Sequence, residues 1–247
     1  MRLANCYFKE ESKMNVMDAS YEIITPISDG GIDELQHIEK IARVCYKSED
    51  KIEEDGSSAK RFVQMLLNNG HEAMLEHSSL SVKFIVDRGV SHELVRHRIA
   101  SFAQESTRYC NYSQDKFGNQ LNVISIAPGI QLDSKMSTQT KLETEPGTIQ
   151  AIINEWFKAM EDAEEHYMRM IQLGATPQIA RSVLPNSTKT EITITANYRE
   201  WRAFFKLRTA NAAHPQMRQV TIPLLNELKG LIPVVFDDIC VEEGKKC

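Results

Sequence analysis

The sequence contains no long hydrophobic run. None of its apolar stretches approaches the roughly 20 residues that a membrane-spanning helix needs. The first twelve residues include Arg2, Lys9 and Glu10 among short apolar stretches, and they lack the apolar block of a secretory signal. We therefore expect a soluble protein of the cytoplasm, without a membrane partner.

Cysteine is scarce and scattered. The chain has 5 cysteines and no Cys-x-x-Cys pair, so neither a disulfide framework nor a thiolate zinc site is indicated, and we expect reduced thiols. His71-Glu72 and Glu76-His77 do not form a zinc-protease motif, because histidines at this spacing would diverge by roughly 240° around a helix. We expect no metal site.

Positive charge is limited as well. The net charge is -5 and the pI is near 5.9, whereas a general nucleic-acid binder requires a basic surface. The sequence also lacks a Gly-x-Gly-x-x-Gly fingerprint after any predicted strand, so a Rossmann-type nicotinamide site is not indicated. Any anion site must therefore be local.

The length of 247 residues permits a sizeable core in one domain, and we expect a single domain over residues 1–247. The one shift in composition is a polar loop excursion at 113–147, rich in Ser, Thr and Gln. Such an excursion is either a functional loop or an insertion, and residues 123–126 predict a short strand within it.

Hydrophobic periodicity predicts more helices than strands. Helical spacing covers residues 35–45, 62–67 and 149–167, with Asp33 as the cap of the first helix and an end near Gly174 for the last. The acidic run Glu161, Asp162, Glu164 and Glu165 is expected to be the solvated face of that long helix.

The remaining patterns complete the fold class. Alternating residues predict strands at 80–86 and 188–196, with Asp87-Arg88-Gly89 turning the chain after the first. A short helix follows Thr176, Asn197 caps another, and His214-Pro215 opens a last one that Pro223 should kink. The order is not a strict βαβ repeat, which favours an α+β fold.

The densest group of chemical side chains lies at residues 96–109, which read RHRIASFAQESTRY. Arginine binds phosphate oxygens with two donors at once, and hydroxyls can complete such a site. An exposed helix face with paired acids is the simpler interpretation of a basic cluster. The interleaved Phe102, Ala103 and Tyr109 argue against it, because part of the segment must pack and a buried arginine needs a partner. The segment therefore indicates a phosphate-ester site.

The same segment resembles the signature of the flavin-dependent thymidylate synthases. Arg96-His97-Arg98 is followed by seven residues and Ser106, and then by Arg108-Tyr109. The resemblance extends from about Ile38 to Leu228, with matching elements in family order at 42–44, 70–72, 76–77, 180–185, 197 and 207–208. It implies an α+β fold with a mixed or antiparallel sheet flanked by helices.

The resemblance also implies the ligands of individual residues. The residues implied for dUMP are Glu93, Arg96, Gln104, Glu105, Ser106, Thr107, Arg108, Arg181 and Arg208. Those implied for FAD are His71, Ala73, Arg96, His97, Arg98, Gln104, Asn197, Arg199, Ala203 and His214. Arg208 is the implied catalytic residue, because a guanidinium against the pyrimidine would stabilise the negative charge that develops as N3 ionises.

The implied activity is the methylation of dUMP to dTMP. Bound FAD is the cofactor, NADPH and 5,10-methylenetetrahydrofolate are co-substrates, and the implied assembly is a homotetramer with shared active sites. Two alternatives remain open. The chain could be a catalytically inactive nucleotide-binding homologue, or an RNA-binding module that uses Phe102 and Tyr109 for stacking, although its net charge disfavours nucleic acid.

Overall fold

The computed structural model describes residues 14–132 and 147–241. The chain divides into two compact units that alternate along the sequence. Unit 1 consists of residues 1–20, 84–96 and 103–192, and unit 2 of residues 21–83, 97–102 and 193–247. The expectation of a single domain stays a prediction.

The strands of the described residues form two sheets. In unit 1, β1 (Asn15–Met17) pairs in parallel with β5 (Asn122–Ile124), which is the short strand predicted inside the polar excursion. An antiparallel sheet has the order β2-β3-β6-β4, and its strands are β2 (Ser20–Ile23), β3 (Ser79–Asp87), β6 (Lys189–Asn197) and β4 (Ala100–Gln104). Both long predicted strands are confirmed as β3 and β6, and the mixed α+β fold is confirmed. The sequence did not predict β4.

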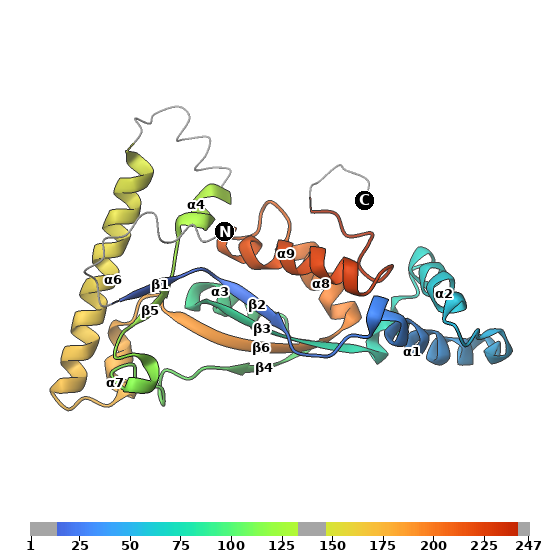
Figure 1. Cartoon of the computed structure of the whole chain (residues 1–247), viewed down its shortest axis with the longest axis horizontal. Coiled ribbons are helices and arrows are strands. Elements are labelled where there is room, and N and C mark those ends of the chain that lie inside the picture. Colours follow the sequence, from blue (N-terminus) through green and yellow to red (C-terminus); the bar gives the residue numbers. More distant parts are fainter. Residues whose placement is uncertain (1–13, 133–146, 242–247) are drawn as a thin grey trace. The chain divides into compact units, whose positions relative to one another are not determined.

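Unit 1 is built around one long helix, α6 (Thr148–Gln172), which Figure 1 draws with the short α7 (Pro177–Ala180) at its end. Its other helices are α3 (Arg88–Leu94) and α4 (Ala127–Leu132). Met160 and Tyr167 of α6 pack with Tyr112, Leu121 and Val123 in a buried cluster. The expected amphipathic helix that ends near Gly174 is thus confirmed.

Unit 2 holds the other helices in the part of the chain that the structure describes. α1 (Ile32–Arg43) and α2 (Ser57–Asn68) pack against each other, as Figure 1 shows. α8 (Tyr198–Arg208) contacts both α9 (Pro215–Leu231) and the 3₁₀ segment Glu72–His77. Aromatic side chains make the core of this part: Trp201 stacks on Phe205, and its indole N–H donates to the carbonyl of Leu80 at 3.0 Å.

The helix caps are partly as expected. The Asn197 side chain accepts a hydrogen bond from the backbone N–H of Glu200 at 2.8 Å, which confirms it as the cap of α8. Asp33 is not the cap of α1, because the helix begins earlier, at Ile32. The N-cap is Gly31 at φ +63°, where a Cβ would lie 2.7 Å from the carbonyl oxygen of Leu231. Only glycine fits this close approach.

Two further expectations are wrong. Asp87-Arg88-Gly89 does not turn the chain, since Asp87 is the N-cap of α3 and accepts a hydrogen bond from the N–H of Val90 at 2.6 Å. Asp, Arg and Gly are typical of turns, but a strand end followed by a cap produces the same letters. Glu164 is not on a solvated face, because it is buried and accepts from the N–H of Leu121 at 2.6 Å.

The state of the cysteines differs in part from the expectation of reduced thiols. Cys45 and Cys110 are free, but Cys240 is disulfide-bonded, so the expectation of reduced thiols is wrong for this residue. Disulfide pairing depends on which thiols the fold brings within bonding distance, and sequence spacing does not reveal this. Cys6, Cys247 and residues 133–146 of the predicted excursion lie outside the described residues.

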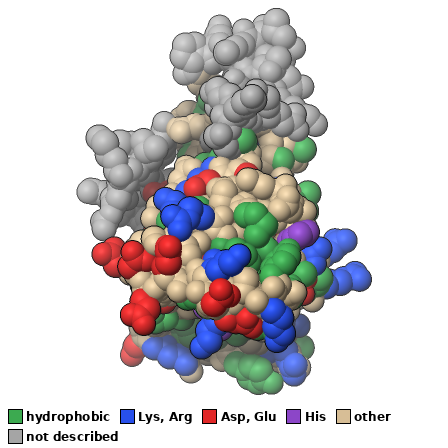
Figure 2. Space-filling view, turned by 90° about the vertical axis from the view of Figure 1, so that its right-hand side faces the viewer, with side chains coloured by type: hydrophobic (Ala, Val, Ile, Leu, Met, Phe, Trp, Pro, Cys, Tyr) green, Lys and Arg blue, Asp and Glu red, His purple; other side chains and the backbone are tan. Residues whose placement is uncertain are grey.

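The face drawn in Figure 2 carries basic side chains interspersed with acidic ones and with hydrophobic groups. Within the described part of the chain, no helix is both long and apolar enough to cross a bilayer.

Candidate functional site

A cavity of about 440 Å³ in unit 1 collects residues from three separate segments. Arg88 begins α3, Thr107 follows β4, and Arg181 follows α7. The other lining residues are His92, Gln178, Ser182, Leu184, Pro185 and Asn186. Two guanidinium groups in one cavity make it a candidate site for an anion.

Arg88 is the residue that the sequence interpretation missed. Its backbone N–H donates to the carbonyl oxygens of Asn186 at 2.8 Å and Thr188 at 3.1 Å, which fixes the residue at the start of α3. Its Nη1 is buried, and among the described residues it has no hydrogen-bond partner. A buried charged donor without an acceptor is costly, so an anion in the cavity would satisfy it. Its position in the sequence, between a predicted strand and the basic segment at 96–109, could have identified Arg88 as a candidate site residue.

Arg181 and Thr107, which are both implied for dUMP, lie in contact with each other. The Arg181 Nη1 donates to the Thr107 hydroxyl at 3.4 Å, and Thr107 is buried. Beside them, Arg108 Nε donates to the side-chain carbonyl of Gln178 at 2.9 Å, and Gln178 lines the cavity. Ser106 accepts from the backbone N–H of Arg108 at 3.4 Å. The structure thus groups Thr107 and Arg181 in the cavity, with Arg108 bonded to its wall.

The other residues implied for uridylate in unit 1 do not line this cavity. Gln104 Nε2 donates to the hydroxyls of Ser91 at 2.9 Å and Thr190 at 3.3 Å. Glu105 accepts from the Tyr112 hydroxyl at 2.8 Å and from Lys189 Nζ at 3.1 Å. Burial and the carboxylate of Glu105 raise the pKa of Tyr112, so this phenol stays protonated and keeps donating.

Glu93 and Arg96, both implied for dUMP, do not share a helix. α3 ends at Leu94, so Arg96 lies beyond the helix, although its backbone N–H still donates to the carbonyl of Glu93 at 3.2 Å. The side chain of Arg96 is exposed, and Glu93 is half-buried.

Unit 2 brings Arg208 against His97. The Arg208 Nε donates to His97 Nε2 at 3.0 Å, and His97 Nδ1 lies 3.3 Å from Glu200 Oε1. The side chain of His97 is 10% exposed, and that of Glu200 is 15% exposed. Burial and the charge of Arg208 lower the pKa of His97, while Glu200 opposes that shift. Both ring nitrogens are therefore engaged within the chain, so a ligand would contact this imidazole through its ring carbons or its face.

The other residues implied for the flavin are distributed over unit 2. His71 Nδ1 pairs with the Tyr46 hydroxyl at 3.1 Å, and Arg199 forms an ion pair of 2.5 Å with Glu76. His214 caps α9 by accepting from the N–H of Gln216 at 3.2 Å. Ala73, Arg98 and Ala203 are exposed. The donor set of arginine, imidazole and amide groups suits the pyrophosphate and polar ring edge of a flavin dinucleotide.

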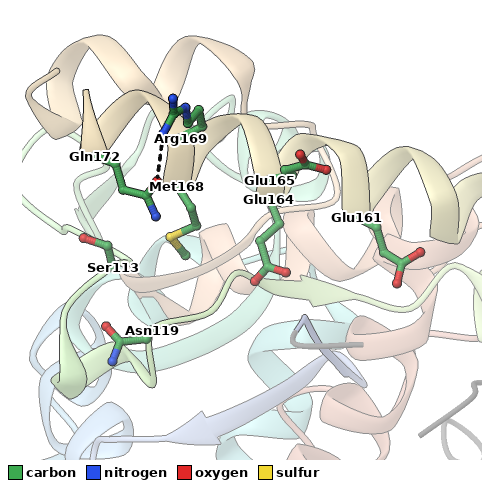
Figure 3. A pocket seen from close by; sticks show the side chains of 8 residues that line it. All are labelled: Ser113, Asn119, Glu161, Glu164, Glu165, Met168, Arg169 and Gln172. Atoms are coloured by element: carbon green, nitrogen blue, oxygen red, sulfur yellow. Dashed lines mark hydrogen bonds between the residues drawn. The ribbon is translucent and has the colours of Figure 1, made fainter. Parts of the chain in front are cut away.

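A larger cavity of about 540 Å³ lies in unit 1, between α6 and residues 113–119 (Figure 3). Glu161, Glu164 and Glu165 of α6 line it, together with Arg169, which donates to Gln172 at 3.5 Å. None of the residues implied for dUMP or FAD is among its lining residues.

Residues 32–234 match the family described as thymidylate synthase complementing protein, Thy1. The chain belongs to this family. The match includes all the signature residues from Arg96 to Tyr109, and the resemblance expected from the sequence is confirmed.

Curated members of the Thy1 family are similar over most of the chain. A flavin-dependent thymidylate synthase of Corynebacterium aurimucosum is 31% identical over 214 residues, which cover 86% of this chain and 82% of that protein. The flavin-dependent thymidylate synthase of Geobacter sulfurreducens is 31% identical over 219 residues, covering 83% of this chain and 85% of that protein. These relatives are enzymes of the methyltransferase class, which confirms the expected enzyme class.

The fold has a solved counterpart. A UMP/dUMP methylase of Streptomyces cacaoi, crystallised with 5-Br UMP, has a TM-score of 0.67 and 24% identity, covering 91% of this chain and 95% of that one. At this identity the likeness shows the Thy1 fold and nothing further.

Proposed function

We propose that this chain methylates dUMP to dTMP, with FAD as cofactor, 5,10-methylenetetrahydrofolate as carbon donor and NADPH as reductant. The observation that carries the proposal is the cavity in unit 1, where Arg88 Nη1 is buried without a partner among the described residues. The names of the curated relatives support the same activity.

The cavity suits the phosphate of a nucleotide. Arg88 and Arg181 supply two positive charges, and the Thr107 hydroxyl supplies a further polar contact. Charge-assisted hydrogen bonds from guanidinium to phosphate are shorter and stronger than neutral ones. Arg108 would add a third charge by releasing Gln178, to which its Nε now donates. We therefore assign Arg88 to the phosphate site beside Ser106, Thr107, Arg108 and Arg181.

Arg208 supplies the electrostatic part of the reaction. A guanidinium against the pyrimidine stabilises the negative charge that develops when N3 ionises, which makes C5 a better nucleophile. The C5–H leaves as a proton, and C5 forms a bond with the methylene carbon as the two bonds of that carbon to the folate nitrogens break. A hydride equivalent from NADPH, two electrons and one proton, completes the methyl group, and the two folate nitrogens take up the proton released from C5 and one from solvent. The products are dTMP, tetrahydrofolate and NADP⁺.

No side chain stores a hydride, so the bound flavin would supply the redox chemistry while the protein supplies placement and charge. His71, Arg96, Arg98, Asn197 and Arg199 are the polar residues that would hold it, with Gln104, Ala73, His97, Ala203 and His214 as further contacts. The imidazole of His97 would contact the flavin while its ring nitrogens keep their hydrogen bonds to Glu200 and Arg208. We also propose a homotetramer with shared active sites, located in the cytoplasm.

A tritium-release assay tests the proposal. The purified protein is incubated with dUMP carrying tritium at C5, with FAD, folate and NADPH present together or omitted one at a time. We expect tritium release to water and dTMP formation only with the complete mixture. Binding of dUMP without tritium release would instead indicate the inactive nucleotide-binding homologue. A protein that neither binds dUMP nor retains flavin would refute the site.

A further inference from the structure

Three side chains of α8 surround the imidazole of His97. Glu200, Phe204 and Arg208 are spaced by four residues, so they lie on one face of the helix. Glu200 Oε1 is 3.3 Å from Nδ1, Arg208 Nε is 3.0 Å from Nε2, and the ring of Phe204 meets the imidazole edge-on at 4.8 Å between centroids. Position and rotation of the imidazole are thereby fixed by a single helix.

The contacts determine the tautomer of His97. A guanidinium has donors only, so Nε2 must accept from Arg208. A neutral imidazole that accepts at Nε2 carries its proton on Nδ1, and that proton points at the carboxylate of Glu200. A cationic imidazole would direct an N–H at the Arg208 donor and lose this contact.

The charges around His97 favour the neutral form. Burial and the positive charge of Arg208 lower the pKa of His97, and the carboxylate of Glu200 raises it by a smaller amount. Arg96 and Arg98, its neighbours in the sequence, are exposed to solvent. The neutral tautomer with Nδ1–H is thus the one that satisfies both Glu200 and Arg208.

The hydrogen bond from Arg208 Nε to His97 Nε2 also restrains the guanidinium, because the five donors of arginine lie in one rigid plane that contains this N–H bond. The backbone carbonyl of Arg208 accepts from the Thr221 hydroxyl at 2.9 Å, which fixes the end of α8. An arginine that stabilises developing charge is most effective when it is already oriented, since no reorganisation is then needed during the reaction.

We propose that Glu200 is a positioning residue, which holds His97 in the Nδ1–H tautomer so that its Nε2 orients the guanidinium of Arg208 for catalysis. The inference rests on the proposed function, because the catalytic role of Arg208 belongs to that proposal.

Glu200 also has a simpler structural role that the test must separate. It lies in the first turn of α8, where a carboxylate stabilises a helix by interacting with the macrodipole. Loss of that role would lower the stability of the protein without changing the tautomer of His97 or the turnover number of the folded enzyme.

The test compares the wild type with Glu200→Ala, Glu200→Gln and the control Glu165→Ala, an exposed glutamate of α6. Histidine-selective ¹⁵N labelling and magic-angle-spinning NMR of the sedimented holoenzyme report the tautomer of each of the 7 histidines, and a His97→Gln spectrum assigns the signal. In parallel, kcat and KM for dUMP are measured per bound flavin.

We expect His97 to carry its proton on Nδ1 in the wild type and in Glu165→Ala. In Glu200→Ala, the Nε2–H tautomer of His97 should appear. The value of kcat should fall about tenfold to 100-fold, which is less than the loss expected when a direct electrostatic contact to the reacting atoms is removed. The KM for dUMP should change little. Glu200→Gln should restore part of both, because its amide oxygen can still accept from Nδ1.

An unchanged tautomer in Glu200→Ala overturns the inference, and so does an altered tautomer with an unchanged kcat. In either case the active wild type leaves the proposed function intact. A wild type that retains flavin but forms no dTMP refutes the proposed function itself, and with it the positioning role of Glu200.

Discussion

Arg202 of α8 binds Asp238 with both terminal nitrogens, at 2.6 Å and 2.7 Å. The Arg202 side chain is 2% exposed, and its Nη2 also donates to Glu72 at 3.1 Å. Burial alone would raise the pKa of Asp238, but the hydrogen bonds and charge of Arg202 hold it below its usual value. Asp238, which follows α9 in unit 2, is therefore bound to α8 through a charged pair.

Replacing Asp238 by Asn should destabilise unit 2. The buried guanidinium would lose a charged acceptor, and since Asp238 is 52% exposed we expect a loss of about 1.5 to 3 kcal/mol at most in the free energy of unfolding. Urea denaturation measures this loss, with the exposed Asp50→Asn as the control. Equal stability of the two variants would show that the pair contributes nothing.

Replacing Arg88 by Leu should weaken the binding of dUMP. One charged contact to phosphate contributes about 1.5 to 3 kcal/mol, which corresponds to about 10- to 150-fold in Kd. Deoxyuridine lacks the phosphate, so its affinity should stay unchanged. Isothermal titration calorimetry of both ligands tests this, with Arg61→Leu as the control because the Arg61 side chain is 71% exposed. If dUMP binds the Arg88 variant as it binds wild type, the cavity is not its phosphate site.

The pH dependence of stability should report His97. Its pKa lies below the ordinary 6.5 in the folded state, so between these two values the unfolded chain binds more protons than the folded one, and stability rises with pH. The free energy of unfolding should therefore fall as the pH is lowered through about 6.5, and His97→Gln should remove this contribution. Urea titrations over that range provide the measurement. The exposed His166→Gln should retain the wild-type slope, and an identical slope in His97→Gln would contradict the prediction.

Asn197 lets the two roles of one side chain be separated. Its oxygen caps α8 at 2.8 Å, so Asn197→Ala should cost about 1 kcal/mol of stability, whereas Asn197→Asp keeps an oxygen at the cap. Asn197→Asp removes the amide donors, and we expect it to lose flavin while staying folded. Flavin absorbance after gel filtration, combined with thermal unfolding, checks both statements. Full flavin retention in Asn197→Asp would limit this residue to capping.

Local patterns predicted the regular elements because they are local in origin. The alternation in β3 and β6 and the helical spacing of α6 follow directly from burying one face of each element. Asn197 could be read as a cap because its bond to Glu200 spans three residues. The start of α1 could not be predicted in this way, because glycine is required at position 31 by the nearby carbonyl of Leu231, which is distant in the sequence.

The sequence by itself determined which chemical groups this protein carries: the basic segment at 96–109, its resemblance to a family that the comparison confirms, and the α+β class. Only the tertiary structure decided which of these groups meet. It placed Arg88 with Arg181 in one cavity, turned Glu105 toward Lys189, and set Glu200, Phe204 and Arg208 around His97. Such contacts join segments far apart along the chain, and their energies depend on burial and distance, which one-dimensional spacing does not contain.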